Sequence, residues 1–189
     1  MNLQNLDIKD LVSKEDWSLF IDRDGVINVR IIDNYVKKPS EFVFIDGSLE
    51  AIVIFKKLFY PILVVTNQQG IGKGLMSIDD LSLVHKKMND DIVKAGGKIN
   101  KIYFCPDLAN SNSKNRKPEI GMALQAKLDF PEIDFKKSIM VGDSISDMKF
   151  GKNARMKTVF IGDKNIAVIN KDIIDYSFSS LLEFAKRLT

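Results

Sequence analysis

The chain has 189 residues, 45% of them hydrophobic and 28% charged, with one cysteine and a formal net charge of +3. This length and composition fit one globular domain with a proper core. A single cysteine excludes an internal disulfide, and the sequence contains no apolar run of membrane-spanning length. The small net charge gives little support for a nucleic-acid partner, and we expect a cytoplasmic monomer that binds neither nucleic acid nor a membrane.

Strands and helices are expected to alternate along most of the chain. Residues 1–17 are expected to be an N-terminal extension with a short amphipathic helix, ahead of a domain at residues 18–189. Apolar runs predict strands at residues 18–22, 61–66, 101–105, 138–142 and 157–161, and a weak strand near residue 176. Apolar spacing and capping signals predict helices at residues 47–59, 77–96, 118–129, 145–154 and 179–188. The third of these would begin at Pro118, and residues 28–44 would form a loop or flap beside the first strand.

This alternation predicts an α/β fold with a doubly wound, Rossmann-like parallel sheet, because the strands are continuous apolar runs. In such sheets, ligands bind beyond the carboxyl ends of the strands. Polar side chains follow the strands at these ends and are therefore expected to form one site, namely Asp22, Asp24, Thr66, Asn67 and Asp143, together with the Arg116-Lys117 pair after the third strand.

The end of the first expected strand carries two carboxylates, Asp22 and Asp24, at positions i and i+2. In an extended segment such residues point to the same side, so both acids would face one site. Two carboxylates held that close repel each other unless a cation lies between them or one is protonated. The pair therefore indicates a metal ligand beside a nucleophile, or an acid beside a base, although a strand that ends in a polar turn would look similar.

These motifs together resemble the haloacid dehalogenase-like superfamily of phosphohydrolases. The resemblance covers about residues 19–162 and comprises Asp22-x-Asp24-Gly25, Thr66, Lys117 and Gly142-Asp143-Ser144-x-x-Asp147, in that order. The segments Asp22 to Asn28, Thr66-Asn67-Gln68 and Arg116-Lys117-Pro118 are similar to the small-capped branch. That branch includes D-glycero-D-manno-heptose 1,7-bisphosphate phosphatases and histidinol-phosphate phosphatases, and it implies a fold with a minimal cap.

The resemblance also implies roles for individual residues. Asp22 would attack phosphorus and form an aspartyl-phosphate, and Asp24 would first protonate the leaving oxygen and then deprotonate water. Mg²⁺ would be bound by Asp22, the Asp24 main-chain carbonyl and Asp143. Thr66 and Lys117 would bind the phosphoryl oxygens. The remainder of a small phosphorylated substrate would contact a set of residues made up of Tyr35, Asn67, Arg116 and Lys117.

One departure concerns a structural zinc ion that close relatives hold with a Cys-x-His pair and a Cys-x-Cys pair before the Arg-Lys-Pro segment. Here the first pair reads Cys105-Pro106-Asp107, and Ser113-Lys114-Asn115 replaces the second. One thiol cannot complete the usual four-ligand site, so we expect no zinc and a shorter loop over residues 107–115 held by other contacts.

Two residues keep a structural interpretation beside a functional one. Asp147 could act near the metal or only cap its helix, because Ser144 to Asp147 matches a capping box. His85, the only histidine, lies among polar neighbours in the middle of a predicted helix and is expected at the surface.

The expected function is magnesium-dependent hydrolysis of a small phosphorylated metabolite, with heptose 1,7-bisphosphate as the first choice and histidinol phosphate as the second. A 3′-phosphatase for nucleic acid shares the chemistry but should carry a basic stripe or stacking aromatics. A non-catalytic sugar-phosphate-binding protein is the alternative from another class, and it would be expected to have lost a catalytic acid.

Overall fold

The computed structural model describes residues 8–9 and 17–189. Six parallel strands form one sheet: β1 (Trp17–Ile21), β2 (Phe59–Asn67), β3 (Lys101–Cys105), β4 (Ser138–Gly142), β5 (Lys157–Ile161) and β6 (Tyr176–Phe178). The helices are α2 (Ser48–Phe55), α3 (Ile78–Lys94), α4 (Gly121–Asp129), α5 (Ile145–Asn153), α6 (Lys164–Ile169) and α7 (Leu181–Arg187), with short 3-10 turns at Pro39–Glu41 and Phe135–Lys137. The helix expected within residues 1–17 lies outside the described residues, apart from residues 8 and 9.

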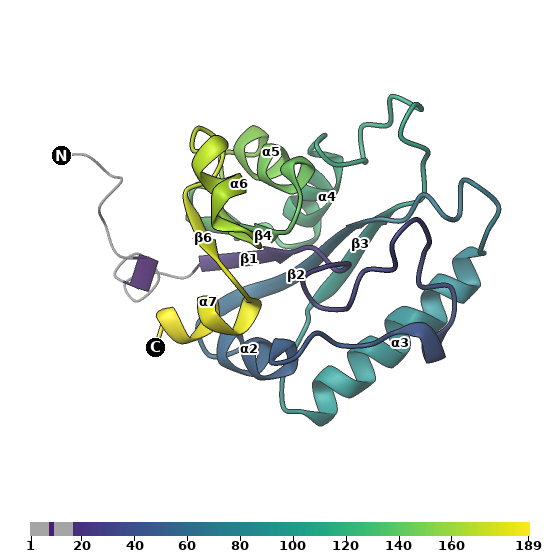
Figure 1. Ribbon diagram of the computed structural model, residues 1–189, viewed down its shortest axis with the longest axis horizontal. Coiled ribbons are helices and arrows are strands. Elements are labelled where there is room, and N and C mark those ends of the chain that lie inside the picture. Colours follow the sequence, from purple (N-terminus) through teal and green to yellow (C-terminus); the bar gives the residue numbers. More distant parts are fainter. Residues whose placement is uncertain (1–7, 10–16) are drawn as a thin grey trace.

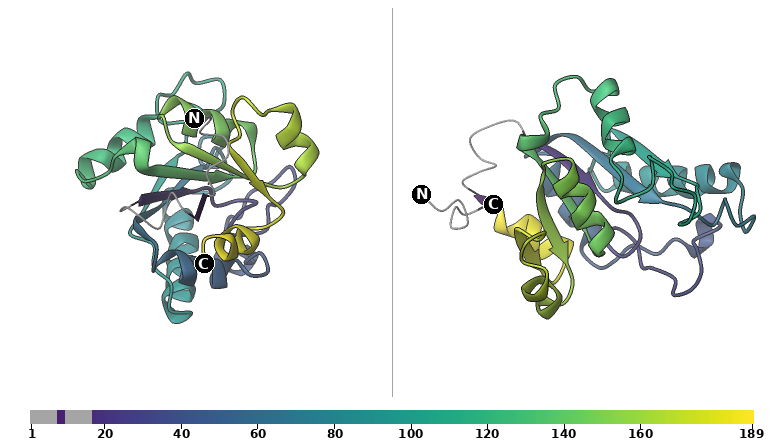
Figure 2. Two further views of the ribbon diagram at one scale, coloured as in Figure 1. Left: turned by 90° about the vertical axis from the view of Figure 1, so that its left-hand side faces the viewer. Right: turned by 90° about the horizontal axis from the view of Figure 1, so that it is seen from above.

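The strand order is β3-β2-β1-β4-β5-β6, which confirms the predicted doubly wound parallel sheet. Helices cover both faces, with α2, α3 and α7 on one and α4 and α5 on the other (Figures 1 and 2). Side chains of β1 alternate between these layers, since Leu19 and Ile21 pack with α2 and α7 while Phe20 packs with α4 and α5. All five residues of β1 are buried, as expected of a central strand covered on both faces.

The order of strands reverses between β1 and β4, and in such sheets this switch point is where ligands bind. Residues 28–44 lie beside this edge and form the minimal cap (Figure 1). The cap is attached at its base by two backbone hydrogen bonds, from Val29 N–H to the Val43 carbonyl (2.8 Å) and from Ile45 N–H to the Ile27 carbonyl (3.0 Å). The expected irregular flap is thus present, with a single 3-10 turn inside it.

One expected helix start was wrong, and one helix was missed. The helix expected from Pro118 begins at Gly121, because residues 116–119 form a turn in which Glu119 N–H donates to the Arg116 carbonyl (2.8 Å). The helix α6 was not predicted. Among the described residues, no helix combines the length and apolar composition that a membrane crossing requires.

Candidate active site

Asp22 lies directly after β1, at the centre of the sheet's carboxyl edge. Its backbone N–H donates to the Val141 carbonyl of β4 (2.9 Å), so the neighbouring strand fixes the position of the residue. The side chain is buried, and this burial raises the pKa of its carboxyl to about 7, with smaller contributions from the Asp147 and Asp143 carboxylates and an opposing one from Lys117. The site therefore concentrates negative charge that needs a positive partner.

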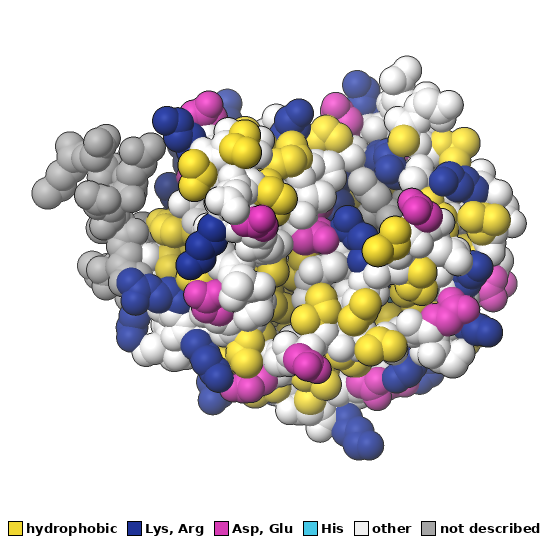
Figure 3. All heavy atoms as spheres, viewed as in Figure 1, with side chains coloured by type: hydrophobic (Ala, Val, Ile, Leu, Met, Phe, Trp, Pro, Cys, Tyr) yellow, Lys and Arg dark blue, Asp and Glu magenta, His cyan; other side chains and the backbone are white. Residues whose placement is uncertain are grey.

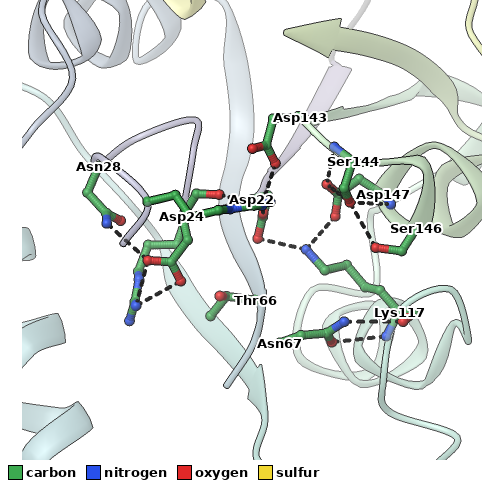
Figure 4. Close-up of polar contacts among 12 residues, drawn as sticks. Asp22, Asp24, Asn28, Thr66, Asn67, Lys117, Asp143, Ser144, Ser146 and Asp147 are labelled. Atoms are coloured by element: carbon green, nitrogen blue, oxygen red, sulfur yellow. Dashed lines mark hydrogen bonds and ion pairs between the residues drawn. The ribbon is translucent and has the colours of Figure 1, made fainter. Parts of the chain in front are cut away.

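Lys117 supplies part of the positive charge that this site needs, from a fully buried position. Its ammonium donates to Asp22 Oδ1 (2.7 Å) and the Val65 carbonyl (2.8 Å), and pairs with Asp147 Oδ1 (2.6 Å; Figure 4). Burial opposes the charge, but the Asp147 and Asp22 carboxylates outweigh it and raise the pKa of Lys117. Its backbone is held by Asn67, whose amide accepts from Lys117 N–H and donates to the Lys117 carbonyl, both at 3.1 Å. Asn67, expected to bind substrate, thus also positions Lys117.

Asp24 is held by three buried donors. Both of its carboxylate oxygens accept from one guanidinium nitrogen of Arg23 (2.9 and 2.8 Å), Oδ1 accepts from Asn28 (3.0 Å) and Oδ2 from Gln68 (2.8 Å). Burial alone would raise the pKa of this carboxyl, but Arg23 and the amide donors outweigh it and lower the pKa. Gln68 also donates to the buried hydroxyl of Thr66 (2.8 Å), which links the second expected phosphate-binding residue to the same group.

Arg23 and His85 are two site residues that sequence reasoning missed. His85, expected at the surface, is buried, and its Nε2 lies 3.1 Å from the guanidinium of Arg23. Its neighbours in sequence are polar, but the buried face of α3 is formed by Leu81, Val84, His85, Met88 and Ile92. That spacing is the apolar stripe of a helix packed on a core, so the periodicity of α3 was a signal for burial that the local composition concealed.

The oxygens expected to bind Mg²⁺ meet around the guanidinium of Arg30, which comes from the minimal cap. Arg30 donates to the Asp24 carbonyl (3.0 Å) and to Asp143 Oδ1 (2.8 Å), and it lies 4.0 Å from Asp22 Oδ2. Burial raises the pKa of the Asp143 carboxyl to about 6, with Arg30 opposing the change. A cation already lies among these hard oxygen donors, so the residues present fit a divalent metal ion.

Gly25 is what allows this close approach of Asp24 and Asp143. A Cβ at residue 25 would lie 1.9 Å from Asp143 Oδ2, and the backbone φ of +91° is one that side chains rarely adopt. The Asp-x-Asp-Gly motif therefore requires its glycine for space as well as for backbone conformation.

Asp147 caps its helix and also lies beside the carboxylates expected to bind the metal. Its Oδ2 accepts from the backbone N–H (3.0 Å) and hydroxyl (2.6 Å) of Ser144 and completes a capping box on α5. Its Oδ1 pairs with Lys117, and its carboxylate lies within 4.8 Å of those of Asp22 and Asp143.

A cavity of about 440 Å³ opens above these residues. Asp22, Asp24, Thr66 and Lys117 line its floor, and residues expected to bind substrate line its walls, namely Tyr35, Asn67 and Arg116. Two cations that were not predicted, Arg30 and Lys73, join them. In the space-filling view, acidic and basic side chains meet in a recess near the centre of the face (Figure 3).

The positions at which close relatives are expected to hold zinc contact one another directly here. The buried thiol of Cys105 lies 3.5 Å from Asp107 Oδ2 and 3.7 Å from the Ser113 hydroxyl, which also accepts from Asn115 N–H (3.2 Å). Burial raises the pKa of this thiol, which disfavours the thiolate that a metal would need. These contacts are of the kind expected to hold a shortened loop, and the absence of zinc stays a prediction.

Comparisons with known proteins identify chains similar to this one. A family model described as polynucleotide kinase 3 phosphatase matches residues 19–187. A protein of Mycobacterium bovis named D-glycero-alpha-D-manno-heptose-1,7-bisphosphate 7-phosphatase is 34% identical over 170 residues, which cover 89% of this chain and 90% of the relative. A Pasteurella multocida protein named for the beta anomer of the same compound is 35% identical over 177 residues, covering 89% and 95%.

Solved structures with the same fold include one that contains magnesium and phosphate. The D,D-heptose 1,7-bisphosphate phosphatase of B. bronchiseptica, complexed with magnesium and phosphate, superposes with a TM-score of 0.81 at 27% identity. The match covers 90% of this chain and 97% of that one. The likeness therefore extends over almost the whole of both folds.

Proposed function

Because the chain belongs to the polynucleotide kinase 3 phosphatase family of haloacid dehalogenase-like phosphatases, we propose that it is a magnesium-dependent phosphomonoester hydrolase. Its proposed substrate is D-glycero-D-manno-heptose 1,7-bisphosphate, from which it removes the 7-phosphate. The observation that carries the proposal is the buried Asp22–Lys117 pair at the floor of a cavity whose walls carry cations. Asp24 lies on the same segment, two residues from Asp22.

In the proposed reaction, an Asp22 oxygen attacks the phosphorus atom, and the bond to the sugar oxygen breaks on the opposite side. The leaving oxygen takes a proton from Asp24. Water then attacks the phosphorus of the aspartyl-phosphate, gives its proton to Asp24 and releases Asp22 with inorganic phosphate. Lys117 and the Thr66 hydroxyl hold the phosphoryl oxygens that do not react.

Asp24 must be protonated for the first of these steps, although its donors favour the ionised form. An entering phosphate group is a like charge, and a like charge raises the pKa of a carboxyl. Asp24 therefore takes up its proton when the substrate binds. After it has protonated the leaving oxygen, its ionised form serves as the base for water.

Asp22, Asp143 and the Asp24 carbonyl would hold the magnesium ion. Its charge offsets the repulsion between the carboxylate nucleophile and the phosphate. Arg30 donates to two members of this donor set, so its guanidinium would compete with the ion for them.

The cavity favours a substrate with a second anionic group. Arg30, Lys73 and Arg116 line it in addition to the residues assigned to the transferred phosphoryl group. Arg116 has its guanidinium placed by a bond to the Asp107 carbonyl (3.2 Å), and Lys73 lies 5.4 Å from the ring centroid of Tyr35. A second phosphate on a seven-carbon sugar is an anion that such a wall would bind.

The test is phosphate release from a panel of esters, with and without Mg²⁺. The panel contains both anomers of heptose 1,7-bisphosphate, histidinol phosphate and an oligonucleotide with a 3′-phosphate, and the Asp22→Asn variant is the matched control. We expect Mg²⁺-dependent release of one phosphate per heptose bisphosphate and none from the variant. Preference for histidinol phosphate or for the oligonucleotide would replace the proposed substrate. Binding of the sugar bisphosphate without turnover would support a sugar-phosphate-binding protein instead.

The expectation of a cytoplasmic monomer belongs to the same proposal. Light scattering at the concentrations used for the assay checks the monomer directly.

A further inference from the structure

The side chain of Arg23 lies in the interior between Asp24 and His85, with no exposed surface. We propose that Arg23 and His85 form a positioning pair that fixes the orientation of the Asp24 carboxylate for proton transfer. The inference rests on the proposed function, because it concerns the group that exchanges protons in that reaction.

The first step of the argument is geometric. One terminal nitrogen of the guanidinium donates to both oxygens of Asp24, and the other lies 3.1 Å from Nε2 of His85. A guanidinium is planar and rigid, so a bond at one nitrogen also fixes the direction of the other. His85 belongs to α3, 62 residues away, so the orientation of Asp24 is anchored to an element outside the loop that carries it.

The second step concerns the charge state of His85. Burial lowers the pKa of its imidazole to about 3, and the positive charge of Arg23 acts in the same direction. Since a guanidinium can only donate, Nε2 of the neutral ring accepts. A carboxylate at this position would neutralise Arg23 and compete with Asp24 for it. A neutral acceptor holds the guanidinium in place and leaves its charge for Asp24.

The third step is that this arrangement costs free energy. Within the described part of the chain, Nε of Arg23 is buried without a hydrogen-bond partner. Buried charges and unpaired donors are destabilising relative to apolar side chains of similar volume. Apolar side chains at positions 23 and 85 would fill the same core with a smaller loss of folding free energy, so stability alone does not account for the Arg23–His85 pair.

The remaining donors to Asp24 complete the constraint. Asn28 and Gln68 are fully buried, and each directs its amide nitrogen at a different carboxylate oxygen. Proton transfer needs the donor and acceptor atoms about 2.6–3.2 Å apart, so a small rotation of the carboxylate is enough to slow it. Loss of the anchor at His85 frees the guanidinium to tilt and the carboxylate to turn with it.

The experiment compares His85→Leu, which removes the acceptor, with His85→Gln, which keeps one. The readout is kcat/KM for p-nitrophenyl phosphate and for heptose 1,7-bisphosphate, because nitrophenolate leaves with little help from an acid and a sugar oxygen does not. We expect His85→Leu to lower kcat/KM about 10-fold more for the sugar ester than for the aryl ester, a fraction of the ~10²–10⁴-fold contribution of a general acid. His85→Gln should restore most of the difference.

Met88→Leu is the matched control, since Met88 lies one turn further along α3 in the same core and should leave the ratio unchanged. An equal loss for both esters in His85→Leu, or none, would overturn the inference while the proposed function stands. If wild type hydrolyses neither ester, the proposed function fails and the inference falls with it. Should His85→Leu fail to fold, Arg23→Lys keeps the buried charge without the planar fork and is judged by the same ratio.

Discussion

Replacement of Asp22 by Asn should abolish turnover and nevertheless stabilise the fold above pH 7. Burial raises the pKa of this carboxyl from its usual 3.8 to about 7. A carboxyl with that change carries a penalty of about 4 kcal/mol when it is ionised in the folded state, at about 1.4 kcal/mol per pH unit. The Asn variant also loses the attraction between Asp22 and Lys117, which reduces the gain. We therefore expect its free energy of unfolding to rise by about 2–4 kcal/mol, or its Tm by roughly 5–10 °C.

The size of this stability gain changes with pH in a defined way. The folded protein binds the Asp22 proton more tightly than the unfolded chain does, so the stability that this group contributes is fully present below pH 4. It is lost as the pH rises through about 7. Asn carries no titrating proton, so its advantage over wild type should be near zero at pH 4 and should reach its full value at pH 8.

The assay is urea unfolding at several pH values in buffer with a chelator, together with phosphate release in Mg²⁺. The Asp90→Asn control removes the same charge from an exposed pair with Lys86 and should change stability by less than about 0.5 kcal/mol. Added Mg²⁺ should stabilise wild type more than Asp22→Asn, because the ion supplies the missing counter-charge. A variant that is no more stable than wild type at pH 8, or one whose gain does not depend on pH, would refute the reasoning.

Three further predictions concern the cations and the glycine of the site. Arg30→Gln should bind Mn²⁺ or Mg²⁺ more tightly than wild type in calorimetry, because the guanidinium no longer competes for the metal ligands. The control Lys73→Gln removes a charge from the same cavity and should change the metal affinity much less. Lys117→Gln leaves two buried carboxylates without their cation and should lose about 3–5 kcal/mol in urea unfolding at pH 7, with the loss shrinking in acid as Asp22 takes up a proton. Gly25→Ala should abolish metal binding in the same calorimetric experiment, since its Cβ would collide with Asp143; an affinity within twofold of wild type would show that the two segments can separate at little cost.

Much of the fold could be predicted because parallel sheets leave a plain record in sequence. The strands β3, β4 and β5 were predicted at their observed bounds, since buried strands are continuous apolar runs. The convergence of Asp22, Thr66, Lys117 and Asp143 followed from one topological rule, that the ends of parallel strands meet at one edge. Helix starts were less secure, because a proline before a helix also fits a turn, and the residue pattern around Pro118 does not separate the two.

Contacts between distant segments could not be predicted in the same way. His85 was placed at the surface from its neighbours, although the apolar spacing of α3 indicates burial. Its partner Arg23 lies on the loop after β1, and nothing near residue 85 in sequence identifies it. The role of Arg30 was not predicted either, since its hydrogen bond to Asp143 joins residues 113 positions apart and depends on the path of the minimal cap. In both cases the missing information was the pairing, not the chemistry of either residue.

Asp147 shows why a choice between a structural and a catalytic interpretation can be misplaced. A carboxylate has two oxygens, and here the capping box uses Oδ2 while Lys117 uses Oδ1. The capping box holds Oδ2 against Ser144, and Oδ1 faces the ammonium that also contacts Asp22. A motif that begins a helix thereby sets the position of a buried cation 30 residues earlier in the chain, and through it the orientation of the proposed nucleophile. Capping is then part of how the site is built, because the helix start and the active site share one side chain.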